Sequence, residues 1–362
     1  MNGYPTISRD NNFDVVRLFA AFEVCLGHTL THFNIGNNPI VGFPGVIIFF
    51  TLSGFLVTLS WCRSNSLKQF VKNRFLRIYP ALFVCFIALQ IIMVVLGHIK
   101  WENLLDWQLW AYWIGQLTIG QFFTPDFLRD FGVGCPNGSL WTIPIEIEFY
   151  LLIPLIFIVF SKIKIQYKYL AAGILSILIN IVLGLIAQEN DGHTNANELI
   201  QGSSIGHLLT KLSLVSVMPY LYCFIAGGLI YLYWDKIKGM FVNRLWIWLP
   251  LYLLLLWWSD YRPGYQINNW ETLFFNLMLG CVAISAAFSL GNTYKILMGF
   301  DISYGIYIIH MIIVNVFLEI GHGNSITDAV ICIILTIGLA ILLNKYVERP
   351  ALRMKTSSNN KA

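Results

Sequence analysis

Charged residues are scarce in this sequence. Only 12% of its 362 residues are Asp, Glu, Lys or Arg, whereas 57% are hydrophobic and 15% are aromatic. Soluble domains carry roughly 25% charged residues, so this composition, with its mean hydropathy of +0.66, excludes an ordinary soluble domain. It indicates an integral membrane protein with several spans.

Cysteine motifs, linkers and repeats are also missing. Of the seven cysteines, only Cys135 falls outside the apolar stretches, and no two have metal-ligand spacing. We therefore expect neither a disulfide framework nor a bound metal. No Pro/Gly/Ser-rich linker or internal repeat interrupts the chain, which predicts one domain over residues 1–362. A cleavable signal peptide is not expected, because the first apolar run carries Arg17, Glu23 and His28.

Ten apolar stretches are candidates to cross a bilayer, whose hydrocarbon core of about 30 Å needs about 17 to 25 helical residues. They lie at residues 13–33, 43–62, 79–97, 140–160, 169–187, 208–233, 245–259, 271–290, 302–320 and 326–344. An eleventh, residues 104–123, is rich in Trp and interrupted by Asp106, two Gln and two Gly. The sequence predicts an all-α bundle of about ten spans.

The basic residues predict the topology. If the N-terminus is cytoplasmic and there are ten spans, 18 of the 23 Lys and Arg face the cytoplasm; the others are Arg17 in the membrane and Lys100, Arg129, Lys211 and Arg262 outside. This bias is the one that the positive-inside rule describes, and a full crossing by residues 104–123 would invert every later loop. We therefore expect that segment to be re-entrant or interfacial, both termini to be cytoplasmic, and the polar segments 98–139 and 188–206 to lie outside.

The net charge of the chain is +4. Binding of the basic loops to anionic lipid explains this excess of positive charge, so no nucleic-acid partner is expected.

The first span contains ionisable side chains, which are costly in a bilayer and often functional. Arg17 and His28 are eleven residues apart, so a helix places them within about 20° of one face and about 16 Å apart along its axis. Asp14 can pair with Arg17 and orient its guanidinium. A neutral histidine suits proton transfer from a hydroxyl, and a guanidinium suits phosphate. Interfacial snorkelling of Arg17 and a plain interhelical contact of His28 are the structural alternatives.

Two further stretches combine small or basic residues. Ser53 and Gly54 lie in an apolar helix, where they allow the close approach of a ligand or of a second helix. Arg74 and Arg77 are three residues apart and share a helical face. They form either a positive-inside cluster or a cytoplasmic phosphate site. Pro80 is expected to open the third span near its first turn.

Two carboxylates open the fourth span. Glu146 and Glu148 are two residues apart and point to different helical faces, which argues against a paired-carboxylate acid/base site. One can be an interior partner for His28 or an arginine, and the other can be interfacial.

These residues occur in an ordered set of motifs that resembles the membrane acyltransferase family 3. The motifs are Asp14-x-x-Arg17 with His28, Phe-Phe-x-Leu-Ser-Gly-Phe-Leu at 49–56, Arg74-x-x-Arg77-Ile-Tyr-Pro, Ser139-Leu-Trp-Thr with Glu146-x-x-Phe-Tyr150, Ser303-Tyr-Gly-Ile-Tyr-Ile-Ile-His310, and Glu348-Arg-Pro350. Together they cover nearly the whole chain. One departure is Pro144, where the family usually has a small residue; we expect it to kink the helix and reorient Glu146.

The resemblance implies a ten-span enzyme that moves an acyl group, usually acetyl from cytoplasmic acetyl-CoA, to a hydroxyl of a glycan or glycolipid. It implies that His28 is catalytic, that Glu146 has the interior role, and that Arg17, Arg74 and Arg77 handle the acyl donor. We accordingly predict nine site residues: catalytic His28 and Glu146; acyl-donor binding by Arg17, Arg74, Arg77, Ser53 and Gly54; and orienting Asp14 and Trp141. Many relatives carry an additional SGNH-type hydrolase domain, which we do not expect within these 362 residues. It therefore resembles the stand-alone members that modify O-antigen of lipopolysaccharide or exopolysaccharide at the bacterial inner or plasma membrane.

The mechanistic hypothesis places the CoA phosphates on Arg74 and Arg77, the pantetheine arm beside Arg17 and the thioester at His28. His28 then acts as a general base or accepts the acyl group covalently; both routes stay open. The alternative function is a secondary transporter or flippase for an anionic or glycolipid substrate, in which the intramembrane charges line a permeation path. Transporters often contain inverted repeats, and none is visible here.

Overall fold

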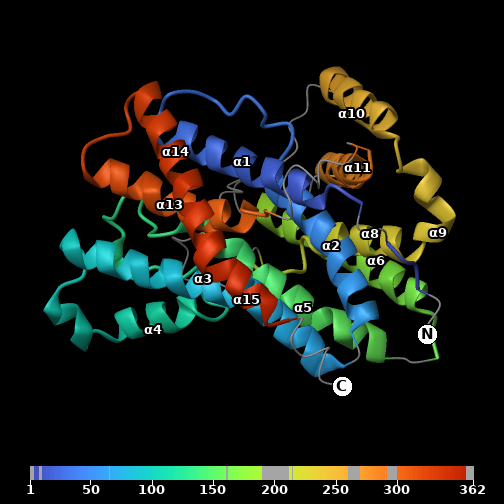
Figure 1. Ribbon diagram of the computed structural model, residues 1–362, viewed down its shortest axis with the longest axis horizontal. Coiled ribbons are helices and arrows are strands. Elements are labelled where there is room, and N and C mark those ends of the chain that lie inside the picture. The colour runs from blue at the N-terminus through green and yellow to red at the C-terminus, as the bar shows by residue number, and fades with distance from the viewer. Residues whose placement is uncertain are drawn as a thin grey trace. The chain divides into compact units, whose positions relative to one another are not determined.

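The computed structural model describes residues 4–7, 10–64, 66–159, 162–189, 212–213, 215–259, 270–289, 291 and 300–355 (Figure 1). All regular elements in these ranges are helices, as the sequence predicts. Most of the segment expected to lie outside at 188–206 falls outside the described residues.

The chain divides into two compact units, each built from separate stretches of sequence. The first contains Met1–Ala20, Val41–Ser64 and Ile145–Gly299; the second contains Ala21–Ile40, Asn65–Pro144 and Phe300–Ala362. Two helices, α1 (Phe13–His32) and α5 (Thr142–Ile158), contribute residues to both units.

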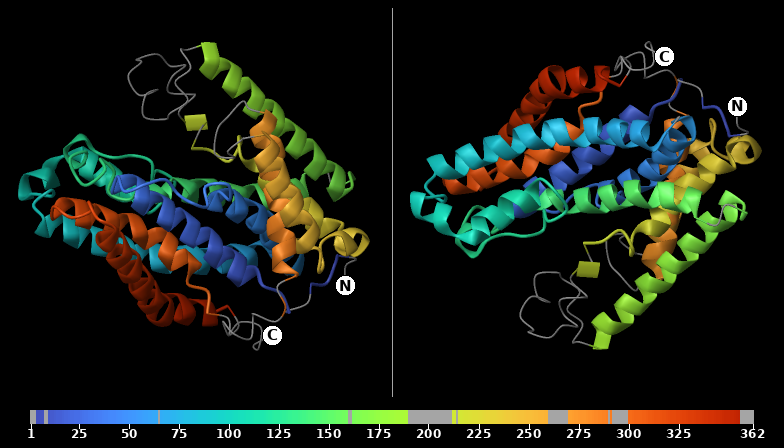
Figure 2. Two further views of the ribbon diagram at one scale, coloured as in Figure 1. Left: turned by 90° about the horizontal axis from the view of Figure 1, so that it is seen from above. Right: turned by 90° about the horizontal axis from the view of Figure 1, so that it is seen from below.

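In the first unit, α2 (Gly45–Arg63) packs on α8 (Leu221–Leu232), and α8 also packs on α6 (Ile165–Glu189). The close approach of α2 and α8 depends on glycines, because a Cβ built on Gly54 would lie 2.0 Å from the Phe224 carbonyl oxygen. After α8 come the short α9 (Trp234–Ile237) and η5 (Lys238–Met240). Figure 2 shows the next two helices, α10 (Leu245–Ser259) and α11 (Trp270–Ala287), running side by side.

In the second unit, α3 (Leu67–Val95) lies against the C-terminal elements of the chain. It contacts α13 (Ser303–Glu319), the π-helical turn η6 (Asn344–Glu348) and α15 (Arg349–Arg353), while α14 (Ile326–Leu343) lies between α13 and η6 in the sequence. Between α3 and α5 the chain forms η1 (Trp101–Leu105), α4 (Trp107–Gln116), η2 (Asp126–Leu128) and η3 (Gly138–Trp141). The α13 and α14 helices pack against each other (Figure 1).

Helix length and hydropathy identify a multi-pass membrane protein. Six segments among the described residues are long and apolar enough to cross a bilayer: Gly45–Arg63, Leu67–Val95, Gly138–Ile158, Ile165–Leu183, Trp270–Ala287 and Ile326–Arg353. A bent pair, Trp234–Met240 with Leu245–Ser259, would make a seventh if it forms one span. Every one of the ten predicted stretches contains a helix, while the count of ten crossings and the sides of the termini stay predictions.

The segment 104–123 contains one short helix, α4, of 10 residues. Its length of about 15 Å is half of a hydrocarbon core, so α4 by itself does not cross. Trp107 and Trp110 are 70% and 50% exposed, as expected of indole rings at a membrane interface. These features fit the re-entrant or interfacial element expected from the charge distribution.

The prediction that Pro80 opens a helix is wrong. The α3 helix begins at Leu67, where Ser66 caps it by accepting a hydrogen bond from the Gln69 amide. Pro80 therefore lies inside the helix. The cap and the favourable helix propensity of the basic stretch start the helix early, and the Tyr304 hydroxyl donates to the Ile78 carbonyl near the proline at 3.1 Å.

Candidate active site

His28 forms a pair with His310. The Nδ1 atom of His28 on α1 lies 2.9 Å from Nε2 of His310 on α13, although the two residues are 282 positions apart in sequence. His310 is completely buried, whereas His28 is partly exposed. The ring of His32, one turn further along α1, lies 5.8 Å from the His28 ring. The second unit therefore presents one accessible imidazole supported by a buried one.

A hydrogen-bond network holds the segment of α13 that carries His310. The Tyr307 hydroxyl donates to the Ser139 carbonyl at 2.9 Å and accepts from the Thr142 hydroxyl at 2.8 Å. Ser139 Oγ lies 3.0 Å from the Tyr307 carbonyl, and the Asn137 side-chain amide donates to the Ile308 carbonyl at 2.9 Å. Two motifs that the sequence singled out, Ser139–Thr142 and Ser303–His310, thus meet in the structure.

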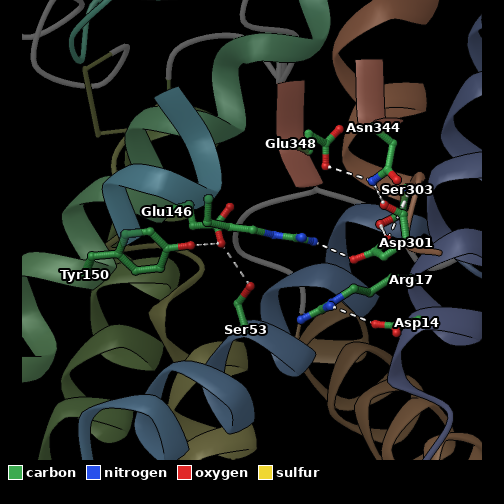
Figure 3. Close-up of polar contacts among 10 residues, drawn as sticks. Asp14, Arg17, Ser53, Glu146, Tyr150, Asp301, Ser303, Asn344 and Glu348 are labelled. Atoms are coloured by element: carbon green, nitrogen blue, oxygen red, sulfur yellow. Dashed lines mark hydrogen bonds and ion pairs between the residues drawn. The ribbon is translucent and has the colours of Figure 1, made fainter. Parts of the chain in front are cut away.

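Arg77 is paired with a carboxylate that the sequence did not indicate. Its guanidinium donates to Asp301 over 2.6 Å. The other Asp301 oxygen accepts from the backbone N–H and the hydroxyl of Ser303 at the start of α13 (Figure 3). The side chain of Asp301 is 9% exposed and that of Arg77 is 21% exposed. This ion pair links α3 to α13.

The same region contains Glu348 of the Glu-Arg-Pro motif. The Asn344 side-chain amide donates to the Asp301 carbonyl at 2.6 Å and lies 3.5 Å from Glu348 Oε2. Glu348 is 3% exposed, and its Oε1 has no hydrogen-bond partner among the described residues. The Asn344 contacts connect η6 to the loop before α13 and so reinforce the position of the Arg77–Asp301 pair.

Arg74 lies one turn before Arg77 on α3, as predicted. It is half-buried, and its guanidinium lies over the Phe70 ring at 5.9 Å. Trp141, predicted as an orienting residue, ends η3 and is also half-buried.

The first unit contains the predicted Asp14–Arg17 pair. Arg17 donates to the Asp14 carboxylate at 3.3 Å, and the two side chains are 24% and 28% exposed (Figure 3). The expected i,i+3 contact is therefore present, which leaves the guanidinium oriented and partly accessible.

Glu146 lies at the centre of a second cluster in the first unit. Its Oε1 accepts from Ser53 Oγ at 3.2 Å and from the Tyr150 hydroxyl (Figure 3). Two residues that the sequence assigned to different roles, Ser53 and Glu146, are thus in contact. The neighbouring Gly54 is buried against the α8 backbone, which is the helix-packing arrangement weighed above. Glu148 instead accepts from the Val217 amide at 2.7 Å.

Pro144 lies at the start of α5 and not in the helix interior, where a proline kinks the axis. The α5 helix begins at Thr142, so Pro144 lies in its first turn, where a backbone N–H has no intrahelical partner in any case. Pro154 is the proline inside this helix.

Within the described residues, no group of three or more His, Cys, Asp or Glu side chains could hold a metal ion. Sequence reasoning missed His310 and Asp301 as partners of His28 and Arg77. His310 stood in a quoted motif, and a histidine within an apolar span was the available signal. Asp301 precedes that motif by two residues and had no comparable signal.

The architecture is that of a membrane protein whose helices carry a partly exposed histidine on a buried one and two partly shielded arginine–carboxylate pairs. Comparison of the sequence with known families finds the acyltransferase domain of family 3 over residues 10–345. The chain belongs to this family and is an acyltransferase, as its motifs predicted.

Curated relatives agree with this membership. Nodulation protein 10 of Rhizobium leguminosarum bv. viciae is 30% identical over 96% of this chain and 94% of its own length. The O-acetyl transferase of Shigella phage Sf6 is 34% identical over 40% of this chain and 45% of its own. The peptidoglycan O-acetyltransferase OatA of Listeria monocytogenes is 34% identical over 33% of this chain and 20% of its own. No solved structure matches the chain.

Proposed function

We propose that this protein is a membrane O-acetyltransferase that moves acetyl from cytoplasmic acetyl-CoA to a hydroxyl of a bacterial surface glycan, such as O-antigen or exopolysaccharide. The observation that carries the proposal is the partly exposed His28 held by buried His310. The names of two relatives, an O-acetyl transferase and a peptidoglycan O-acetyltransferase, support acetyl transfer to oxygen.

In the proposed reaction, His28 removes the proton of the acceptor hydroxyl as its oxygen attacks the thioester carbonyl. The new C–O bond forms, the C–S bond breaks, and the imidazolium of His28 returns its proton to the departing sulfur. General base catalysis of this kind contributes about 10²- to 10⁴-fold in rate. The phosphates of the donor contact Arg74 and Arg77 at the cytoplasmic end of α3, and Arg17 guides the pantetheine arm.

The proposed topology has ten spans with both termini in the cytoplasm of a bacterial inner or plasma membrane. It is supported by the distribution of Lys and Arg in the sequence. In this arrangement the basic N-terminal end of α3 faces the compartment that contains acetyl-CoA.

The test uses inverted membrane vesicles that contain the full chain and receive acetyl-CoA labelled in the acetyl group. We expect label on a glycan with the native chain and at least about 10²-fold less with His28→Ala. His322→Ala is the matched control, because His322 is 59% exposed and lies on the loop before α14; it should retain full activity.

Undiminished acetylation by a normally expressed His28→Ala chain would overturn the proposed mechanism. Movement of a glycolipid across the vesicle membrane without any acetylation would instead support the transporter alternative. Mass and linkage analysis of surface polysaccharide from cells with and without the gene would identify the acceptor.

A further inference from the structure

We propose that His310 is a positioning residue that sets the tautomer of His28, so that His28 carries its proton on Nδ1 and presents a bare Nε2 to the acceptor hydroxyl. The inference rests on the proposed role of His28 as the base, but it concerns a property of the ring that can be measured without any turnover.

The tautomer follows from a chain of two hydrogen bonds. His310 Nδ1 lies 3.1 Å from the carbonyl oxygen of Ile306. A carbonyl can only accept, so His310 Nδ1 must carry hydrogen. A neutral imidazole has one N–H, which leaves His310 Nε2 as an acceptor. His28 Nδ1, at 2.9 Å from that atom, must therefore donate, and the lone pair of His28 is left on Nε2.

The surroundings of His310 favour the neutral ring that this argument requires. The side chain is 0% exposed, and an isolated charge at such a position is costly. Among the described residues, two titratable rings lie beside the pair: His32 on α1 is 5.8 Å from the His28 ring, and Tyr307 on α13 is 6.0 Å from the His310 ring. No carboxylate in the described part of the chain forms an ion pair with His310.

The ring geometry fits a directed hydrogen bond. The centroids of His28 and His310 are 5.1 Å apart with an interplanar angle of 23°. With the two nitrogens at 2.9 Å, the rings meet edge to edge rather than face to face. His310 is held in this orientation by Ile306 on its own helix and by the Tyr307 network, which ties α13 to Ser139 and Thr142.

The arrangement has a consequence for the reaction. When His28 takes a proton on Nε2, its Nδ1–H donates to His310 as a charge-assisted bond, which is stronger than the neutral one. His310 then stabilises the imidazolium as it forms, in the way that an orienting group supports the base of a catalytic triad. This benefit arises in the transition state, so loss of His310 should lower kcat and leave KM nearly unchanged.

The first arm of the test reads the tautomer directly. The full chain is labelled with ¹⁵N-histidine, reconstituted in lipid and studied by solid-state NMR at neutral pH, with His28→Ala used to assign the His28 signals. We expect His28 to be protonated on Nδ1 and bare on Nε2. A His28 ring protonated on Nε2 would overturn the proposal, whatever the protein's substrate.

The second arm compares two replacements of His310. The amide oxygen of Gln reaches about as far as the histidine Nε2 and can accept from His28, whereas Leu cannot. We expect His310→Gln to keep kcat within about tenfold and His310→Leu to lose about 10²-fold, with equal thermal midpoints confirming that both fold.

Full activity in His310→Leu would overturn the proposal, as would a folded His310→Gln chain no more active than His310→Leu. If the native chain transferred no acetyl group at all, the proposed function would fail, and the NMR arm would still decide the tautomer.

Discussion

Arg77 and Asp301 form a 2.6 Å ion pair between residues 224 positions apart, and both side chains are largely shielded from solvent. The pair joins the basic end of α3 to the start of α13, the helix that carries His310. Arg77 therefore has a structural contact in addition to the donor-binding role that its motif implies.

Breaking this ion pair should destabilise the protein. Arg77→Met leaves the Asp301 carboxylate without its cationic partner, which costs on the order of 3 kcal/mol for a buried pair. We expect the thermal midpoint of the purified chain to fall by several degrees. The double variant Arg77→Met/Asp301→Asn removes the stranded charge and should recover part of the loss. A double variant whose loss equals the sum of the two single losses would show that the two side chains are not coupled.

Substitution of Gly54 should disturb the packing of α2 on α8 rather than the binding of the acyl donor. A Cβ at this position would lie 2.0 Å from the Phe224 carbonyl oxygen, so Gly54→Ala forces α2 and α8 apart and costs about 1–3 kcal/mol. Gly338→Ala is the matched control, since a Cβ on that exposed helical glycine meets no atom within 4 Å. Thermal unfolding in detergent measures both. A Gly54→Ala chain with native stability and a raised KM for acetyl-CoA would favour the ligand-binding role instead.

The two carboxylates of α5 should respond differently to loss of charge. Glu146→Gln replaces the carboxyl group that accepts hydrogen bonds from Ser53 and Tyr150 with an amide. We expect the rate of acetyl transfer to fall at least about tenfold in a folded chain. Glu148→Gln alters the acceptor for the Val217 amide and should mainly lower thermal stability. The labelled-vesicle assay and a melting curve separate the two effects. Equal acetyl-transfer rates in the two variants would contradict the expectation that the charge of Glu146 matters more for activity than that of Glu148.

Cys135 should react slowly with alkylating reagents. Burial raises the pKa of its thiol, while a hydrogen bond from Thr124 and the charge of Arg129 oppose that shift. A raised pKa means less thiolate at pH 7–8, so alkylation should be slow there and should increase only at higher pH. The measurement uses a chain in which the other six cysteines are replaced.

Asp130→Cys, placed in a chain that also lacks Cys135, provides the exposed control for this experiment, since Asp130 lies on the same loop and is exposed. Comparable alkylation rates at the two positions across the pH range would contradict the expected shift.

Several features of this protein follow from sequence alone because they are local. Hydropathy over about 20 residues identified the membrane class and the helical stretches, and the spacing of Asp14 and Arg17 predicted a contact that is present at 3.3 Å. The ordered motifs indicated the acyltransferase family that the comparison over residues 10–345 confirms.

Tertiary structure decided which distant residues meet. His28 pairs with His310, Arg77 with Asp301, and Glu146 with Ser53, at sequence separations of 282, 224 and 93 residues. A span that is apolar on every side has little hydrophobic periodicity to indicate which of its faces points to the protein interior. These partners could therefore not be derived from local sequence patterns. The positions of Pro80 inside α3 and of Pro144 in the first turn of α5 likewise depended on where each helix begins. Sequence supplied His28 as a candidate base, and the packing of α13 supplied the buried ring that orients it.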